Sequence, residues 1–217
     1  MPRRLISVTP LISLLFILAA TAAPLPIPKP PATGATAFII QDFHSGRVIA
    51  EEASDLPVEP ASITKLMTAY AVFRELASGN IALEDMVTIS EKAWRTPGSR
   101  MFVEVGKHVS VEDLLKGMII QSGNDATVAL AEYIAGSEET FAALMNRHAE
   151  ELGQTRSHFM NSTGLPDDEH YMSARVIARL ASMLIREFPD YYDWFSHKEF
   201  TWNDITQYNR NKLLWRD

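Results

Sequence analysis

The sequence contains no cysteine among its 217 residues. This absence excludes a disulfide framework, a thiolate nucleophile and zinc sites built on cysteine. Positive charge is also scarce, because 20 lysines and arginines face 27 acidic residues and give a formal net charge of −7. No basic stripe occurs along the chain, so we do not expect nucleic acid as a partner. The six histidines form no His-Glu-x-x-His motif, so we predict no metal site and no cofactor.

Long apolar runs are absent too, apart from one near the N-terminus. Arg3 and Arg4 precede an apolar run from Leu11 to Ala20, and small residues follow at Ala20-Thr-Ala22. The run is shorter than the ~20 residues that a membrane-spanning helix needs. We therefore predict a secretory signal peptide over residues 1–22, with an uncleaved anchor as the alternative. The chain would then be exported, to the periplasm or the outer face of the cytoplasmic membrane of a bacterium.

Proline is concentrated directly after this segment. The stretch Pro24-Leu-Pro-Ile-Pro-Lys-Pro-Pro31 favours an extended spacer without a core. The rest of the chain has the composition of a globular protein, since 47% of all residues are hydrophobic and 22% are charged. We predict a linker over residues 23–35 and one folded unit over residues 36–217.

Hydrophobic patterns within this unit predict a β-hairpin followed by a block of helices. The hairpin strands are expected at Ala37–Ile40 and Arg47–Ala50. Helices are expected over residues 62–77, 111–118, 124–135, 139–152 and 173–188. Short strands or turns are expected at 86–89 and 107–110, and a strand and turn over 200–214. The fold class is therefore α/β, in the α+β sense.

The first of these helices carries a lysine among apolar residues. Five apolar residues after Pro60 recur at three- and four-residue steps, which is the period of a packed helix face: Ile63, Leu66, Met67, Tyr70 and Phe73. Lys65 falls inside this pattern and follows Ser62 by three residues, so the two side chains can touch. A buried amine with a lowered pKa can accept the proton of a serine hydroxyl and activate it as a nucleophile. The alternative is a helix-terminal serine beside a lysine that reaches solvent.

A second polar cluster, Ser122-Gly-Asn124, lies between an apolar segment and a predicted helix. A hydroxyl and an amide at such a junction could relay a proton and hold a substrate amide. The alternative is a helix cap, since serine and asparagine are favoured there.

Together, the two clusters resemble the first two of the three motifs of penicillin-interacting serine enzymes, Ser-x-x-Lys and, 60 residues later, Ser-x-Asn. The chain resembles the D-alanyl-D-alanine carboxypeptidases, the low-molecular-mass penicillin-binding proteins, from Ala37 to Asp217. The stretches that carry the resemblance are Pro60-Ala-Ser-Ile-Thr-Lys65, Gly98-Ser-Arg-Met-Phe102, Gln121-Ser-Gly-Asn-Asp-Ala126, Met145-Asn146, Phe159-Met-Asn-Ser-Thr-Gly-Leu-Pro166, His170-Tyr-Met-Ser-Ala-Arg175 and Gln207-Tyr-Asn-Arg-Asn-Lys-Leu-Leu214.

The resemblance implies a fold, a reaction and roles for four residues. The fold is that of serine β-lactamases and DD-peptidases, a helical block against an antiparallel sheet. Ser62 would be the acylated nucleophile and Lys65 its base. Ser122 would pass the proton to the leaving D-alanine, and Asn124 would bind the substrate amide and orient Lys65. The substrates would be peptidoglycan stem peptides ending in D-Ala-D-Ala, with β-lactams as inhibitors.

The third motif, Lys-Thr-Gly, is not found up to Asp217. The resemblance therefore implies a catalytic domain that lacks its C-terminal sheet strands, and membrane association only through a C-terminal anchor that is also missing. We expect the 217-residue chain alone to be inactive. A D-Ala-D-Ala endopeptidase, a serine β-lactamase and a non-catalytic fragment remain alternatives.

Three further positions bear on this interpretation. Val176 and Asp204 stand where the family usually has aspartate and glycine, so a salt bridge could be lost at the first and the turn strained at the second. Glu199 begins a Glu-x-x-x-Asn pattern that mimics the deacylating glutamate of β-lactamases. We interpret Glu199 as ordinary surface charge.

Overall fold

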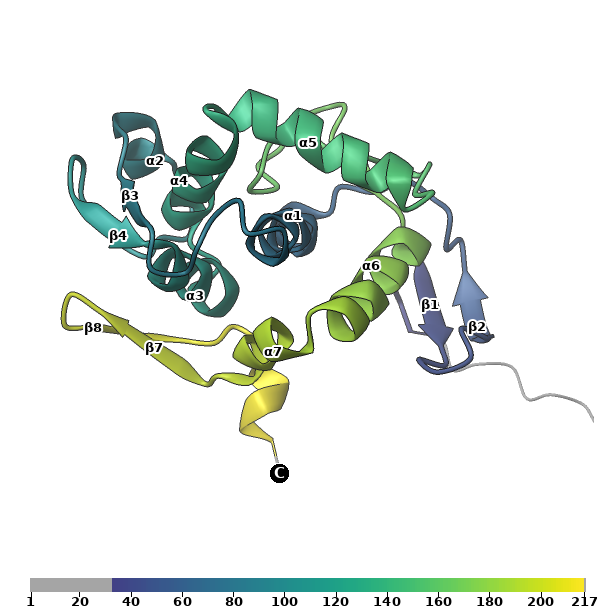
Figure 1. Cartoon of the computed structure of the whole chain (residues 1–217). Helices are drawn as coiled ribbons and strands as arrows, with labels where there is room; N and C mark the ends of the chain where they lie inside the picture. The colour runs from purple at the N-terminus through teal and green to yellow at the C-terminus, as the bar shows by residue number, and fades with distance from the viewer. Residues whose placement is uncertain (1–32, 217) are drawn as a thin grey trace, which may run out of the picture. The chain divides into compact units, whose positions relative to one another are not determined.

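The computed structural model describes residues 33–216, and its central element is helix α1 (Lys65–Ala77). Figure 1 shows α1 end-on among four other helices, all of which contact it: α3 (Val111–Gln121), α4 (Asn124–Ala135), α5 (Glu138–Glu151) and α6 (Ala174–Glu187). These are the predicted helices, with ends that shift by up to three residues. The apolar stripe of α1 lies in the core, since Met67, Tyr70 and Phe73 are 0–1% exposed.

The prediction that Ile63 belongs to the buried stripe is wrong. Ile63 is 45% exposed, whereas Leu66 is half-buried. The reason is a 3₁₀ helix, η1 (Ala61–Thr64), that precedes α1. A 3₁₀ helix has three residues per turn in place of 3.6, so the stripe of α1 does not continue into it.

The strands form four antiparallel pairs and no larger sheet within residues 33–216. The predicted N-terminal hairpin is confirmed, and it packs against α6 (Figure 1). Its apolar residues are poorly covered, because Ile40, Val48 and Ile49 are 48%, 37% and 61% exposed. The pairs are β1 (Phe38–Gln41) with β2 (Val48–Glu52), β3 (Met86–Thr88) with β4 (His108–Ser110), β5 (Ser157–His158) with β6 (Tyr171–Met172), and β7 (Glu199–Trp202) with β8 (Ile205–Tyr208).

The last pair matches the strand and turn expected over residues 200–214, and a 3₁₀ helix, η3 (Lys212–Trp215), follows it. Asn203 and Asp204 form the turn between β7 and β8 with φ angles of 47° and 60°. Residues other than glycine adopt this left-handed region at a cost, so the turn carries the expected strain. Glu199 is exposed on β7, in agreement with its interpretation as surface charge.

Three short helices were not expected from the sequence, namely α2 (Glu91–Arg95), α7 (Pro189–Tyr192) and η2 (Asp193–Ser196). Each spans four or five residues, which is too few for a periodic pattern. Helix α6 ends before Pro189 as predicted, and that proline then begins α7. This position suits proline because the first turn of a helix does not need its missing N–H.

Arg175, the neighbour of Val176, forms two ion pairs. Its guanidinium contacts the carboxylates of Glu51 and Asp55 at 2.5 and 2.9 Å. Val176 itself is 5% exposed and belongs to the core. These contacts join the start of α6 to the end of β2 and to the segment after it.

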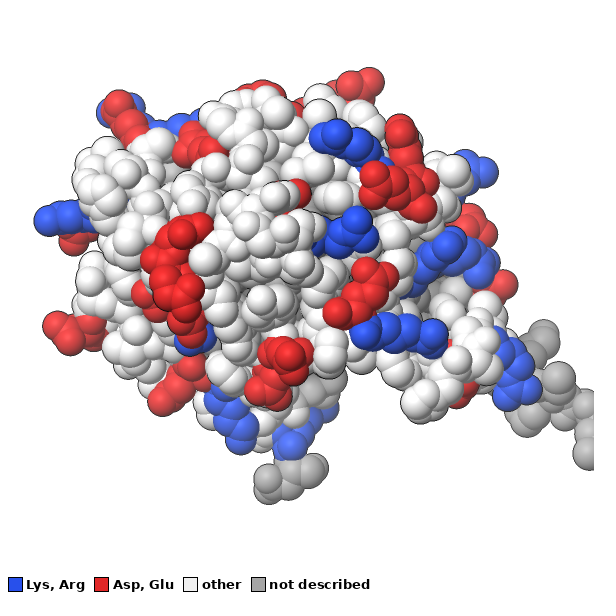
Figure 2. Space-filling view, in the orientation of Figure 1, with Lys and Arg blue, Asp and Glu red and all other residues white. Residues whose placement is uncertain are grey.

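The predicted signal peptide (1–22) and most of the predicted linker (23–35) lie outside the described residues. In the part of the chain that is described, no helix has the length and apolar character required to span a bilayer. Figure 2 shows acidic and basic side chains interspersed over the visible face, without a continuous basic stripe there.

Candidate active site

Three of the four predicted site residues line one cavity of ≈ 90 Å³. Ser62 comes from η1, Lys65 is the first residue of α1, and Ser122 lies between α3 and α4. The apolar part of the wall is formed by Leu66, Met118, Ile119 and Phe195. The site therefore joins two serine side chains and an amine in a partly apolar setting.

Lys65 is buried, with 6% of its surface exposed, and its amine has three hydrogen-bond partners. Its Nζ lies 2.7 Å from Asn124 Oδ1, 2.7 Å from the carbonyl oxygen of Thr163 and 3.2 Å from Ser62 Oγ. Burial, and to a lesser degree the positive charge of Arg210, lowers the pKa of Lys65 from 10.5 to about 8. A substantial fraction of the amine is therefore neutral slightly above neutral pH.

This geometry suits a neutral amine that acts as a base. A neutral amine has two N–H groups and one lone pair. The amide oxygen of Asn124 and the carbonyl of Thr163 can only accept, so they take the two N–H groups at 2.7 Å each. The lone pair is then left for the third neighbour, the hydroxyl of Ser62. A base within hydrogen-bond reach of a serine hydroxyl is the arrangement that activates a serine nucleophile.

The amide of Asn124 is oriented by the loop that follows α2 and precedes β4. Its Nδ2 donates to the carbonyl of Pro97 at 2.7 Å, and its backbone N–H donates to the carbonyl of Ser99 at 2.7 Å. These contacts leave Oδ1 facing Lys65. Gly98 leaves room for this amide, because a Cβ at position 98 would lie 2.6 Å from Nδ2 of Asn124.

Ser122 differs from the other three residues in having an Oγ without a hydrogen-bond partner in the described chain. It adopts a left-handed conformation, with a φ of 62°, at the C-terminal end of α3. Ala61, directly before Ser62, also has a positive φ, of 46°. Two non-glycine residues in this strained region next to the cavity are typical of a functional site.

Two contributors to the site were not assigned from the sequence. The carbonyl of Thr163 is a backbone group, and only the stretch Asn161-Ser-Thr-Gly-Leu marked its neighbourhood. Arg210 stood in a motif quoted for the resemblance, but nothing in its spacing indicated that its charge acts on Lys65.

His170 ties η1 to the segment that contains Thr163. Its Nδ1 accepts the backbone N–H of Met160 at 3.1 Å, so its Nε2 carries the proton and donates to Thr64 Oγ1 at 2.8 Å. Burial lowers the pKa of His170, which favours this neutral form. Residues 33–216 contain no group of three histidines, aspartates or glutamates that could hold a metal ion.

Two known proteins are similar to this chain in sequence. The chain is 46% identical over 208 residues to the D-alanyl-D-alanine carboxypeptidase DacC of Escherichia coli (strain K12), and it is 42% identical over 195 residues to DacA of the same strain. The alignments cover 93% and 87% of this chain but 52% and 48% of the relatives, so the chain spans about half their length.

A solved structure is also similar. Penicillin-binding protein 5 from Haemophilus influenzae superposes with a TM-score of 0.84 at 42% sequence identity, over 86% of this chain and 55% of that one. The β-lactamase and DD-peptidase fold expected from the sequence is therefore confirmed. Residues 25–217 match the peptidase S11 family, described as D-alanyl-D-alanine carboxypeptidase, and the chain belongs to this family.

Proposed function

We propose that this chain carries the nucleophile half of a serine D-Ala-D-Ala carboxypeptidase that acts on peptidoglycan stem peptides and is acylated by β-lactams. The observation that carries the proposal is the amine of Lys65, which has an acceptor for each N–H group and lies 3.2 Å from Ser62 Oγ. Export of the protein and action in the periplasm are part of the same proposal.

In the first step, Ser62 Oγ attacks the carbonyl carbon of the penultimate D-alanine while its proton moves to Nζ of Lys65. The peptide C–N bond then breaks and leaves an ester on Ser62. The departing amine of the terminal D-alanine needs a proton, and Ser122, which lines the same cavity as Lys65, would relay one from the protonated amine. Water then hydrolyses the ester, returns the proton to Ser62 and releases the shortened peptide.

Ser122 suits the relay because it lines the cavity and its Oγ has no hydrogen-bond partner within residues 33–216. A hydroxyl that is free in the resting site can bind the leaving nitrogen without first breaking another hydrogen bond. The positive charge of Arg210 acts on the same cavity and favours an anionic substrate there. No lysine of a third motif is assigned to the substrate carboxylate, because the sequence to Asp217 contains no Lys-Thr-Gly.

Acylation by a fluorescent penicillin tests this proposal. The reading frame is sequenced past the Asp217 codon, and the protein that it encodes is expressed, labelled and digested. We expect the label on the peptide that contains Ser62 and no label in Ser62→Ala. A label on Ser122, or undiminished labelling of Ser62→Ala, would refute the assignment. Release of D-alanine from a diacetyl-lysyl-D-Ala-D-Ala peptide then tests the carboxypeptidase reaction itself.

A further inference from the structure

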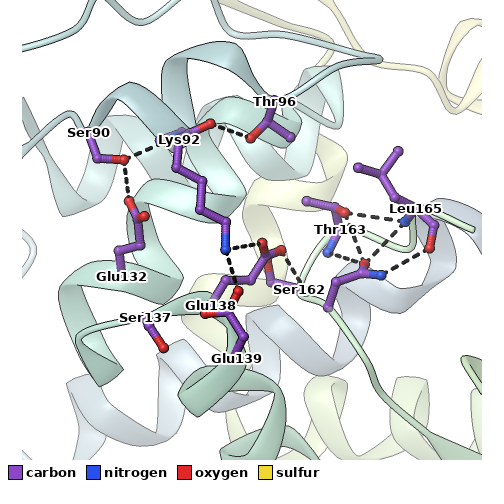
Figure 3. Close-up of polar contacts among 12 residues, drawn as sticks. Ser90, Lys92, Thr96, Glu132, Ser137, Glu138, Glu139, Ser162, Thr163 and Leu165 are labelled. Atoms are coloured by element: carbon purple, nitrogen blue, oxygen red, sulfur yellow. Dashed lines mark hydrogen bonds and ion pairs between the residues drawn. The ribbon is translucent and has the colours of Figure 1, made fainter. Parts of the chain in front are cut away.

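Ser162 is fully buried, and each of its polar groups has a partner outside its own turn. Its backbone N–H and its hydroxyl both donate to Oε1 of Glu138, at 3.1 and 2.8 Å, and its carbonyl accepts from Thr68 Oγ1 at 2.6 Å. Figure 3 shows Glu138, from α5, beside Ser162. The residue directly before Thr163 is therefore held from two helices.

Ser162 is linked to Lys65 through two consecutive backbone carbonyls, its own and that of Thr163. Thr68 lies three residues after Lys65 on α1, so the two side chains share a helix face. Thr68 binds the carbonyl of Ser162, and Lys65 binds the carbonyl of Thr163. The Thr163 carbonyl and the Gly164 N–H belong to the same planar peptide group. This group is also held through its N–H, which donates to Asn161 Oδ1 at 2.8 Å. A shift of Ser162 would therefore move an acceptor of the amine.

A second carboxylate provides a natural comparison. Lys92 contacts Oε2 of Glu138 at 3.2 Å and Oε1 of Glu139 at 2.7 Å (Figure 3). The two glutamates are adjacent in the first turn of α5 and share this cation. Only Glu138 also contacts the turn with Ser162, and its side chain is 12% exposed against 75% for Glu139. A general preference for acids at a helix N-terminus applies to both residues and does not explain this difference.

We propose that Glu138 is a positioning residue, which acts through Ser162 on the Thr163 carbonyl and so keeps the amine of Lys65 directed at Ser62. The inference rests on the proposed function, because it assigns a role in the acylation of Ser62. Glu138 does not touch the substrate. Its task is to supply a buried acceptor for two donors of Ser162, which would otherwise be unpaired.

Three variants of the protein expressed from its complete reading frame test this role: Glu138→Ala, Glu138→Gln and Glu139→Ala. Glu138→Ala removes the acceptor, whereas Glu138→Gln keeps an oxygen that can accept from Ser162 but loses its charge. Glu139→Ala removes the other partner of Lys92 and leaves the turn untouched. Amide hydrogen exchange of Ser162 and Gly164 reports on the turn, and the rate of penicillin acylation reports on Lys65. Thermal denaturation confirms that each variant is folded.

Loss of its hydrogen bond to a charged acceptor is expected to speed exchange of the Ser162 amide at least about tenfold in Glu138→Ala. Misplacement of the base is expected to slow acylation by about 10- to 100-fold. Glu138→Gln should stay within about threefold of the wild type in both measurements, because the acceptor remains. Glu139→Ala should match the wild type.

The proposal is overturned if Glu138→Ala and Glu139→Ala agree in both exchange and acylation, or if Glu138→Gln is as impaired as Glu138→Ala. Failure of the proposed function gives a different pattern, in which the wild-type protein is not acylated at Ser62. The exchange comparison then still decides whether Glu138 holds the turn.

Discussion

Ser62 and Ser122 line the same cavity but differ in their hydrogen bonding. The hydroxyl of Ser62 already has a partner without substrate. That partner is the amine of Lys65, which is buried and has two close acceptors. On the Ser122 side, the hydroxyl has no partner within residues 33–216. In the proposed reaction, the base would be positioned before substrate arrives, whereas the second hydroxyl would acquire its hydrogen bond from the substrate.

The largest expected effect comes from removing the base on the Ser62 side. Lys65→Arg keeps the positive charge, but a guanidinium does not give up its proton at accessible pH. We expect the rate of penicillin acylation to fall by about 10³-fold or more, measured by labelling of the protein expressed from its complete reading frame. Acylation of Lys65→Arg at close to the wild-type rate would make Lys65 a structural residue.

A smaller effect is expected on the other side of the cavity. Ser122→Ala removes a proton relay, and such relays contribute about 10²- to 10⁴-fold to rates. Because Ser122 Oγ has no partner to lose among the residues that the structure describes, the free energy of unfolding should change by less than about 0.5 kcal/mol. Acylation kinetics and denaturant unfolding measure the two quantities. Wild-type acylation in this variant, or a large loss of stability, would contradict the contrast between the two serines.

Gly98 tests how the amide of Asn124 supports the base. In Gly98→Ala, the new Cβ would lie 2.6 Å from Asn124 Nδ2 and move the amide away from Lys65. We expect acylation to slow by about tenfold, since geometry near the reacting atoms is sensitive to small shifts. Gly106→Ala is the matched control, because Gly106 also has a positive φ, of 76°, but nothing lies within 4 Å of its Cβ.

Both variants should lose about 1 kcal/mol of stability from the left-handed backbone, and Gly98→Ala should lose more because it also displaces the Asn124 amide. Only Gly98→Ala should slow acylation. Equal acylation rates in the two variants would show that the position of the Asn124 amide does not matter to the base.

The β1–β2 hairpin should have the smallest effect on chemistry. Ile49 is 61% exposed on β2, so Ile49→Thr should leave the acylation rate unchanged and the free energy of unfolding within about 0.5 kcal/mol. Self-association should decrease, because exposed apolar edge strands favour pairing between chains. Sedimentation of the wild type and the variant at matched concentration measures this. A slower acylation rate in Ile49→Thr would link the hairpin to the cavity.

Much of this architecture follows from local sequence patterns. The hairpin and the five long helices were predicted because each has a period or a turn signal within a short window. The contact between Ser62 and Lys65 follows from their three-residue spacing, and it survives the change from α- to 3₁₀-helix at Thr64. The exposure of Ile63 was missed because the same change alters the number of residues per turn.

The rest of the site depends on contacts between distant segments. The Thr163 carbonyl lies 98 residues from Lys65 in sequence and has no side-chain signature. The carboxylate of Glu138 reaches Ser162 across 24 residues, and nothing in the sequence distinguishes it from Glu139. Such partners are defined by the packing of α1, α5 and the intervening turn, which local patterns do not encode.

The pH dependence of Ser62 acylation tests the central claim most directly. If Lys65 must be neutral to accept the proton, the rate rises with pH and levels off above the pKa of the amine. Burial and Arg210 lower this pKa to about 8, so the midpoint is expected near pH 8. The rate of labelling by a fluorescent penicillin, measured from pH 6 to pH 11 with a check of folding at each pH, gives the profile. A midpoint near the ordinary lysine value of 10.5, or a rate that falls as pH rises through 8, would contradict a neutral Lys65 as the base.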